Sequence, residues 1–511
     1  MMSFVSFQAR ARREADILVA ISFALLLGGP VSGCSSGTGL TTAKGGAGGA
    51  TPDGGGTGGS GAGGSQPDAG LDGPGVEVPA PTPIVVPTPT FAASRPSADC
   101  TATLATPVAP LLLDATISCA GGGGPTALAA GAQGAGFVAV GATGSTASTR
   151  VLSLSAQGVV SGDQGPDGAI IAGLVAEPAG GVDLVSLAGG VNFFHAVDGG
   201  WMRELLAPPG PPMAAPTERF DFDAAGRSPD GRVNLVYDHW QDSYAEVSMS
   251  TRSAEGSWTA LPLPPFIAWR NSAMAVPPAG AAILVHDHLP SSASLQLDAW
   301  SGGLDSALVS LPKASDGSDD IQSVGAAVDA VGTLTASFET HGQGVVIVRP
   351  AGTSPRTVAI AGTQMAVPVG CPDWPRTSPT ALPSMTCTQT GTGGSGRQAL
   401  IAAGGTIWVA YLLTHMDRDV FWSCAPSFSG GSFDCGGEIT IDRSTSELVL
   451  ERLTAAGGHA VRWRTSVGVG DAVFFMGADG GATRLLLAFS PSPPSAGKPT
   501  FRYVALDATA P

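Results

Sequence analysis

The chain has 511 residues, of which 73 are glycine and 41 are proline, and only 13% are charged. This composition excludes a helical bundle or a coiled coil, because the helices of those folds are rich in lysine and glutamate. The formal net charge of -16 argues against a nucleic-acid partner, since a phosphate-binding surface needs clustered cations.

Residues 1–33 are predicted to be an export signal. Arg10, Arg12 and Arg13 precede an apolar run from Ile17 to Leu27. A helix of that length extends only about 16 Å, whereas the core of a bilayer is about 30 Å thick. A cleaved signal peptide is therefore favoured over a transmembrane anchor.

The apolar run ends at Val31-Ser32-Gly33-Cys34, which resembles the lipobox of bacterial lipoproteins. The resemblance implies that Cys34 is the acylated first residue of the mature chain, so that the lipid bilayer is a partner. Ser35 follows the cysteine, whereas an aspartate there would resemble the signal for retention in the inner membrane. We therefore expect an outer-membrane lipoprotein of the bacterial cell envelope, on the periplasmic side or at the cell surface. The alternative is an ordinary secretory signal with an incidental cysteine.

Residues 34–91 are predicted to be a disordered tether that links the lipid to a folded domain. The stretch Gly45–Gly75 is rich in glycine, alanine, serine and aspartate, and Val78–Thr90 is rich in proline. The first composition is typical of a flexible coil and the second of a semi-rigid extended spacer. Such a segment cannot bury a core of its own.

Cysteine spacing predicts disulfide bonds beyond the tether. Without Cys34, the remaining cysteines lie in three close pairs: Cys100 with Cys119, Cys371 with Cys387, and Cys424 with Cys435. An exported protein can form disulfides, and three local bonds are the simplest of the possible pairings. A zinc site is the alternative, but the sequence contains no C-x-x-C pair.

Residues 92–511 are predicted to form an all-β β-propeller. A recurring segment has an apolar alternating strand, a turn with glycine, and a second strand. The turn glycines of these segments are Gly136, Gly181, Gly231, Gly280, Gly332, Gly405 and Gly458. Their spacing is about 50 residues, the length of a four-stranded blade. The one longer step contains a predicted disulfide-clipped insertion at 361–396, and a second insertion is predicted at 424–435.

The repeat predicts seven blades, with six or eight as alternatives. Two further strands, Leu111–Ile117 and Phe501–Leu506, are predicted to complete a blade across the ring closure and so leave no open edge. Two stacked sandwich domains are the competing architecture. The repeats carry neither a Gly-His and Trp-Asp pattern nor a kelch signature. Turns at 198–201 and 253–258 faintly resemble the Asp-boxes of sialidases, which implies only a blade turn.

Histidines and acidic residues follow several of the predicted second strands. This candidate set comprises Asp238, His239, His286, Asp287, His288, Glu339, His341, His415 and Asp417. Loops after the second strand open on one face of a propeller, so the set is predicted to form a rim that binds a divalent metal (calcium or zinc) or a cationic ligand. The alternative is that these strand ends are polar because they meet water.

The sequence offers no catalytic residues. Its G-x-S-x-G match at 33–37 lies at the lipidation site and not on a strand-to-helix turn. We therefore expect a non-enzymatic, monomeric surface lipoprotein whose propeller binds a protein or glycan ligand on its loop face. One alternative is a glycan hydrolase or lyase, which needs paired carboxylates with one shifted pKa. A surface protein with a purely structural role is the other.

Overall fold

The computed structural model describes residues 80–509 apart from internal segments, the longest of which are 208–218, 313–323 and 360–384. The described residues are mostly in strands, with one short helix, the single 3-10 turn η1 (Ala132–Gly134). No helix in these ranges is both long and apolar enough to cross a bilayer. The predicted signal peptide, Cys34 and most of the predicted tether lie outside the described residues.

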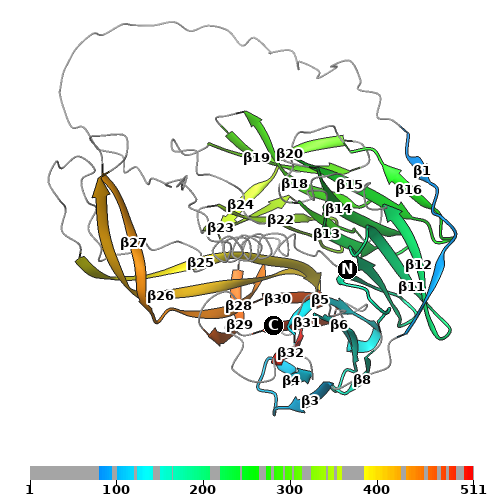
Figure 1. The fold of residues 1–511 in the computed structure, drawn as a ribbon, viewed down its shortest axis with the longest axis horizontal. Helices are drawn as coiled ribbons and strands as arrows, with labels where there is room; N and C mark the ends of the chain where they lie inside the picture. Colours follow the sequence, from blue (N-terminus) through cyan, green and yellow to red (C-terminus); the bar gives the residue numbers. More distant parts are fainter. Residues whose placement is uncertain are drawn as a thin grey trace, which may run out of the picture.

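The described strands form seven antiparallel sheets, each named here after its first strand (Figure 1). The β5 sheet contains β5 (Pro125–Ala130), β6 (Gly136–Val140), β7 (Arg150–Leu154) and β8 (Val160–Asp163). The β9 sheet contains β9 (Ile171–Ala176), β10 (Val182–Ser186), β11 (Val191–Val197) and β12 (Gly200–Ala207), with β2 (Thr90–Ala93) at its edge. The β13 sheet contains β13 (Arg219–Arg227), β14 (Val233–Gln241), β15 (Tyr244–Arg252) and β16 (Trp258–Leu261), with β1 (Thr82–Ile84) at its edge.

The remaining four sheets follow in chain order. The β17 sheet contains β17 (Ser272–Ala275), β18 (Ile283–Ser291), β19 (Ser294–Ser301) and β20 (Leu304–Pro312). The β21 sheet contains β21 (Val324–Val328), β22 (Leu334–Thr340), β23 (Gln343–Arg349) and β24 (Arg356–Ala359). The β25 sheet contains β25 (Met385–Ala403), β26 (Thr406–Pro426), β28 (Thr445–Leu453) and β29 (His459–Gly468), with β27 (Phe433–Asp442) paired to β26. The β30 sheet contains β30 (Val473–Ala478), β31 (Arg484–Ser490), β32 (Thr500–Asp507), β4 (Leu111–Cys119) and β3 (Cys100–Leu104).

The sheets follow one another around a closed ring. The first strand of each sheet contacts the first strand of the next, from β5 through β9, β13, β17, β21 and β25 to β30, and β30 contacts β5. A closed ring of antiparallel sheets is a β-propeller, so the all-β prediction is confirmed. The alternative of two stacked sandwich domains is wrong, because the first strands of all seven described sheets contact one another in one ring.

The two ends of the domain meet in the β30 sheet. Strand β32, near the end of the chain, pairs with β4 along most of its length. An ion pair reinforces this ladder, with Arg502 Nη2 lying 2.7 Å from Asp114 Oδ2. The disulfide Cys100–Cys119 links β3 to β4 within the same sheet, as predicted. Both predicted closing strands therefore contribute to one sheet, in which backbone hydrogen bonds and a salt bridge join the two ends of the domain.

Glycines on the first two strands of a sheet allow neighbouring sheets to pack closely. A Cβ atom added at Gly173 of β9 would lie 2.4 Å from the ring of Phe222 on β13. The same addition at Gly136 of β6 would lie 2.2 Å from the hydroxyl of Tyr503 on β32. Aromatic rings thus fill the space that these glycines leave, and Tyr503 and Phe222 are buried at 0% and 8% exposure. The core lies between the sheets and consists of the apolar faces that strand alternation predicts.

The end of the predicted tether is ordered, which corrects the proposed boundary at residue 91. Strand β1 pairs with β16, and β2 pairs with β12, so the segment lies along the outer edges of two neighbouring sheets. Pro83 lies opposite Thr259 in this pairing. Proline lacks a backbone donor, but an outermost strand needs donors on one side only. A proline-rich composition therefore did not distinguish an edge strand from an extended spacer.

The last predicted repeat was assigned to the wrong hairpin. The segment around Gly458 joins β28 to β29, which are the outer strands of the β25 sheet and do not begin a new one. The first hairpin of the last sheet is β30–β31 instead. Both hairpins of a blade have the same apolar alternation and the same kind of turn, so spacing alone did not tell them apart.

The β25 sheet carries a three-stranded arm that projects from the ring (Figure 1). Strands β25 and β26 are 19 and 21 residues long, and β27 pairs with the second half of β26. This pairing places Cys424 opposite Cys435, as a disulfide between them requires, although the bond itself stays a prediction. Cys387 takes part in a disulfide bond, and its predicted partner Cys371 lies outside the described residues.

Candidate functional site

Two aspartates are buried together between the β13 and β17 sheets. Asp238 of β14 lies opposite Asp221 in the β13–β14 ladder, and Asp223 is the extra residue where the register shifts between Phe222 and Ala224. Asp223 and Asp238 are 2% and 5% exposed. The hydroxyl of Ser272, on β17, donates to Oδ2 of Asp223 at 2.8 Å. We call Asp223 and Asp238 the acidic pair.

The acidic pair holds protons at unusually high pH. Burial is the main cause that raises the pKa of Asp223 to about 7, and Asp221 and Asp287 raise it further by charge repulsion. Burial likewise raises the pKa of Asp238 well above its usual value, followed by repulsion from Asp223. The two carboxyl groups hydrogen-bond to each other, which requires one of them to be protonated.

One oxygen of the pair lacks a hydrogen-bond partner among the described residues. Oδ1 of Asp238 is buried and makes no hydrogen bond within the described part of the chain. Burial of an unpartnered carboxylate oxygen is costly, and native proteins usually supply a donor, a water molecule or an ion. Among the described residues, the acidic pair therefore lacks the donor, water molecule or ion that a buried carboxylate oxygen usually contacts.

Part of the predicted rim belongs to this region. Asp238 is one member of the pair, and Asp287 of β18 is close enough to raise the pKa of both members. His286 is fully buried, and its Nδ1 lies 3.3 Å from the carbonyl oxygen of Asp287. His239 instead stacks on the ring of Phe220, with ring centroids 4.6 Å apart. Asp238 and Asp287 of the prediction thus come together, whereas His239 packs against an aromatic ring.

Other predicted rim residues lie in the β25 sheet or cannot be placed. His415 Nε2 lies 3.3 Å from Glu447 Oε2, and Asp417 forms an ion pair with Arg443 on the arm. The side chains of His288 and Glu339, and all of His341, lie outside the described residues. Within the described residues, the predicted set contains no three ligand atoms that lie within 4.8 Å of one another.

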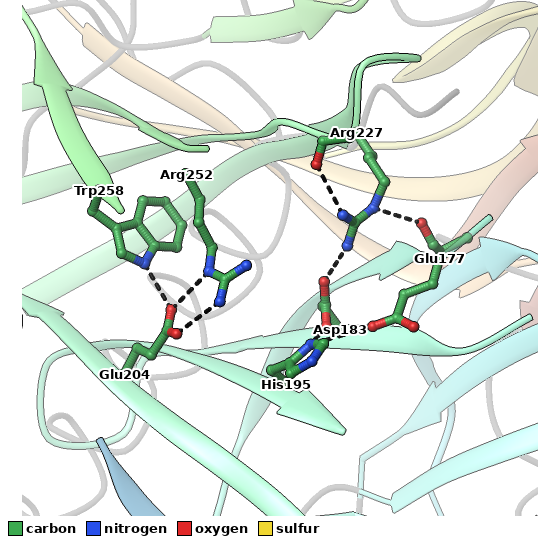
Figure 2. A network of polar contacts seen from close by, with 9 residues as sticks. Glu177, Asp183, His195, Glu204, Arg227, Arg252 and Trp258 are labelled. Carbon is green, nitrogen blue, oxygen red and sulfur yellow. Dashed lines mark hydrogen bonds and ion pairs between the residues drawn. The ribbon is translucent and has the colours of Figure 1, made fainter. Parts of the chain in front are cut away.

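The residues that do meet this distance criterion are Glu177, Asp183 and His195 of the β9 sheet (Figure 2). Nδ1 of His195 lies 2.9 Å from Oδ1 of Asp183 and 3.3 Å from Oε1 of Glu177. Arg227 of the neighbouring β13 also contacts the buried carboxylate of Asp183 and donates to the carbonyl of Ala176. The triad has the donor types of a metal site, but an arginine already neutralises its most buried member.

A second ion pair joins the same two sheets nearby (Figure 2). Glu204 of β12 accepts hydrogen bonds from Nε and Nη2 of Arg252 at 3.0 and 2.9 Å. It also accepts one from the indole nitrogen of Trp258 at 2.7 Å. These residues lie at the end of the sheets that carries the β9–β10 turn. We therefore call the following set the turn-side network: Glu177, Asp183, His195, Glu204, Arg227, Arg252 and Trp258.

Hydrogen bonding and burial shift the pKa values within the turn-side network. The hydrogen bond to Asp183 raises the pKa of His195, and burial raises the pKa of Glu177. The sequence analysis did not identify this network. Its members are far apart in the chain, and only the contact between the β9 and β13 sheets brings the arginines to the carboxylates. Its charges are largely compensated, which is typical of a structural clamp.

Comparisons with known proteins identify no family. No family model matches the chain, and no curated protein has a significantly similar sequence. Among solved structures, the chain is similar to the polysaccharide lyase Uly1, with 10% identity and a TM-score of 0.45 over 76% of this chain and 91% of that one. It is also similar to a protein of unknown function from Dyadobacter fermentans, with 11% identity and a TM-score of 0.38 over 78% and 98%. A third similarity is to the Dos1 propeller, with 10% identity and a TM-score of 0.35 over 76% and 93%. Similarities this distant assign no activity to the chain.

Proposed function

We propose that the protein is a non-enzymatic lipoprotein of the bacterial cell envelope that presents a seven-bladed propeller as a binding module. The lipobox-like sequence ending at Cys34 supports the anchor, and the Cys100–Cys119 disulfide fits an exported protein. One blade for each of the seven sheets supports the blade number.

The acidic pair carries the proposal about the ligand. Oxygen donors of like charge, one of them without a hydrogen-bond partner, suit a hard divalent cation such as calcium. The pair lies at the end of the β13 sheet where β14 connects to β15, which is opposite to the turn-side network. A cation held there would replace the shared proton and stabilise the contact between the β13 and β17 sheets. We propose that the cation-loaded end of these sheets is the part that engages the ligand.

Calorimetric titration with calcium chloride tests this proposal directly. The sample is the full chain with Cys34→Ala, which keeps the protein free of lipid. Because a cation displaces the shared proton, binding should release protons and should be tighter at pH 8 than at pH 6. Asp238→Asn should abolish this binding, whereas the control Asp230→Asn, at an exposed turn, should leave it unchanged.

A parallel titration with zinc chloride distinguishes the two polar regions. Zinc prefers imidazole nitrogen together with carboxylates, so it suits Glu177, Asp183 and His195 better than the acidic pair. Metal binding that His195→Gln removes and Asp238→Asn does not would place the ion in the turn-side network. That result, or the absence of any binding at pH 8, would refute the assignment to the acidic pair.

Glycan cleavage is the second candidate function, and the same pair is the observation that favours it. Two neighbouring carboxyl groups with raised pKa values, one of about 7, have the chemistry of a general acid and its partner. Both groups are almost fully buried, which favours binding of a small cation over attack on a polymer. Release of reducing ends or unsaturated sugars from a panel of polysaccharides, lost in Asp223→Asn, would support the enzyme instead.

The membrane anchor is tested separately. We expect the chain with Cys34 intact to sediment with membranes and to enter the detergent phase. Cys34→Ala should release it to the soluble fraction, because the acyl chains are its only proposed attachment. Retention of the variant in the membrane fraction would refute the lipoprotein assignment without affecting the cation test.

A further inference from the structure

The β3–β4 hairpin of the β30 sheet ends in exposed apolar side chains. Leu104, Val108 and Leu112 are 54%, 74% and 46% exposed. The sequence contains no charged residue between Asp99 and Asp114, so the whole hairpin turn is uncharged. Single exposed apolar residues are normal on a protein surface, whereas a group of them on one uncharged turn marks a contact surface.

The turn between β7 and β8 extends this apolar surface. Strand β8 of the β5 sheet contacts β3, so the two turns lie against each other (Figure 1). A Cβ atom added at Gly158 would lie 2.8 Å from Cδ2 of Leu104 and 2.9 Å from Cδ1 of Leu113. The next residue, Val159, is 58% exposed, and residues 155–159 carry no charge. We define the apolar tip as the four exposed side chains of the two turns: Leu104, Val108, Leu112 and Val159.

The hairpin holds the apolar tip in place. The disulfide Cys100–Cys119 joins the two strands at the other end of the hairpin. Within the turn, the backbone N–H of Leu111 donates to the carbonyl oxygen of Val108 at 2.9 Å. Two of the six residues 105–110 are prolines, which have no N–H group. The turn therefore has fewer backbone donors to desolvate when it enters an apolar phase.

The register of the β30 sheet shows at which end the apolar tip lies. Leu111 of β4 pairs with Leu506 of β32, which in turn pairs with Leu485 near the start of β31. The apolar tip is thus at the end that carries the β30–β31 turn, the counterpart of the β9–β10 turn. The acidic pair lies at the opposite end of its sheet. A surface that contacts the apolar tip therefore leaves the acidic pair on the far side of the propeller.

The chemistry of the apolar tip favours a lipid surface over a protein partner. Protein interfaces combine an apolar centre with a polar rim and hydrogen bonds, whereas the two turns offer apolar side chains without charge. Apolar side chains are favourable at the boundary between headgroups and acyl chains, where a charge would be costly.

The chain that precedes the described residues brings such a surface within reach. The described chain begins at Ala80, which is 46 residues after Cys34. A coil of that length, as predicted for the tether, spans about 40 Å. An acylated Cys34 would therefore confine the propeller beside a bilayer at a high local concentration. The tether does not decide which face meets the lipid, but the apolar tip can.

We propose that the apolar tip inserts into the headgroup boundary of the bilayer and orients the propeller with the acidic pair facing away from the membrane. The inference rests on the proposed lipid anchor for this confinement. The contact by itself is weak and reversible, so the acyl chains remain the attachment that holds the chain in the membrane fraction.

Fluorescence quenching by brominated lipid tests the insertion on the full chain with Cys34→Ala, mixed with an excess of phosphatidylcholine vesicles. Val108→Trp should add emission that dibrominated phosphatidylcholine quenches. Val473→Trp is the matched control, because Val473 is a partly exposed valine at the opposite end of the same sheet. Its added emission should not be quenched.

Vesicle flotation measures the strength of the contact. Val108→Asp removes an inserted valine and adds a charge, so it should lower the partition coefficient by about tenfold, whereas Val473→Asp should leave it unchanged. Anionic phosphatidylglycerol should not strengthen binding, because the apolar tip has no cation. Both valines are exposed, so both variants should unfold in urea like the parent.

Three results would overturn the proposal. The first is that the parent chain does not bind excess vesicles, and the second is that Val108→Asp binds as well as the parent. The third is a dimer in sedimentation that Val108→Asp dissociates, which would assign the apolar tip to a second copy of the chain. Because the tested chain lacks Cys34, none of these results bears on the lipid anchor, which membrane fractionation tests separately.

Discussion

The turn-side network and the acidic pair are both buried between neighbouring sheets, but their partners differ. In the network, Arg227 and Arg252 of the β13 sheet bond to carboxylates of the β9 sheet. The described contacts of the acidic pair are with the hydroxyl of Ser272, with each other and with further carboxylates. The network therefore joins two sheets through opposite charges, whereas the acidic pair contacts the next sheet through the hydroxyl of Ser272 and repels other carboxylates.

This difference separates charges that the chain itself compensates from charges that respond to solvent conditions. A buried carboxylate beside an arginine stays ionised at neutral pH and needs nothing from solvent. A buried carboxylate beside another carboxylate has a raised pKa and responds to pH and to cations. The carboxylates of both regions are buried, so burial does not distinguish them. The difference is that arginines contact the carboxylates of the network, whereas other carboxylates surround the acidic pair.

Removal of Glu204 should have the largest effect on stability. Glu204→Ala leaves the guanidinium of Arg252 and the indole N–H of Trp258 without their acceptor in a buried place. Breaking such a buried pair costs about 3 kcal/mol of the free energy of unfolding. Urea unfolding of the variant at pH 7 measures the loss. The exposed ion pair of Arg232 with Asp230 is the control, and Arg232→Ala should cost less than about 1 kcal/mol. Equal losses in both variants would contradict the role of the network as a clamp.

Neutralising one member of the acidic pair should raise the free energy of unfolding, whereas removal of Glu204 should lower it. Because the pKa values of Asp223 and Asp238 are raised, the folded chain keeps protons that the unfolded chain releases between about pH 4 and pH 7. Stability therefore falls as pH rises through this range. Asp238→Asn removes the repulsion and should be more stable than the parent at pH 8 by about 2 kcal/mol, with little difference at pH 4. Urea unfolding at both pH values, without divalent cations, tests this. If the variant is less stable than the parent at pH 8, charge repulsion between Asp223 and Asp238 does not destabilise the folded chain.

Much of the fold was predictable because propeller strands alternate in polarity and their turns contain glycine. The inner hairpins β9–β10, β13–β14 and β21–β22 turn at or beside the predicted glycines. The closing strands β4 and β32 were predictable too, since each is an apolar strand left without a partner in its own repeat. The edge strands β1 and β2 were not, because a proline-rich sequence is compatible with both an extended linker and an outer strand.

The candidate site was predictable only in part. Asp238 and Asp287 are next to histidines after apolar strands, which is the pattern that singled them out. Asp223 was missed because the sequence Phe220-Asp221-Phe222-Asp223 reads as a regular strand with its acids exposed. Its burial depends on the register shift at Phe222 and on Ser272 of the next sheet, and neither is encoded locally.

The smallest expected effect on stability is that of His195→Gln. This variant tests whether the stability of the turn-side network depends on protonation of the imidazole. Its hydrogen bond to Asp183 raises its pKa above 6.5, and the charged groups around it are Asp183, Glu177, Arg227 and Arg252. A raised histidine pKa adds stability that is fully present below pH 6.5 and is lost as pH rises through the folded-state value. His195→Gln should therefore cost less than about 1 kcal/mol at pH 5.5, since the side chain is 39% exposed, and nothing measurable at pH 9. Thermal unfolding at the two pH values measures the difference. An equal loss at both would mean that the imidazole contributes by packing and hydrogen bonding, and that the arginines alone balance the charge of the network.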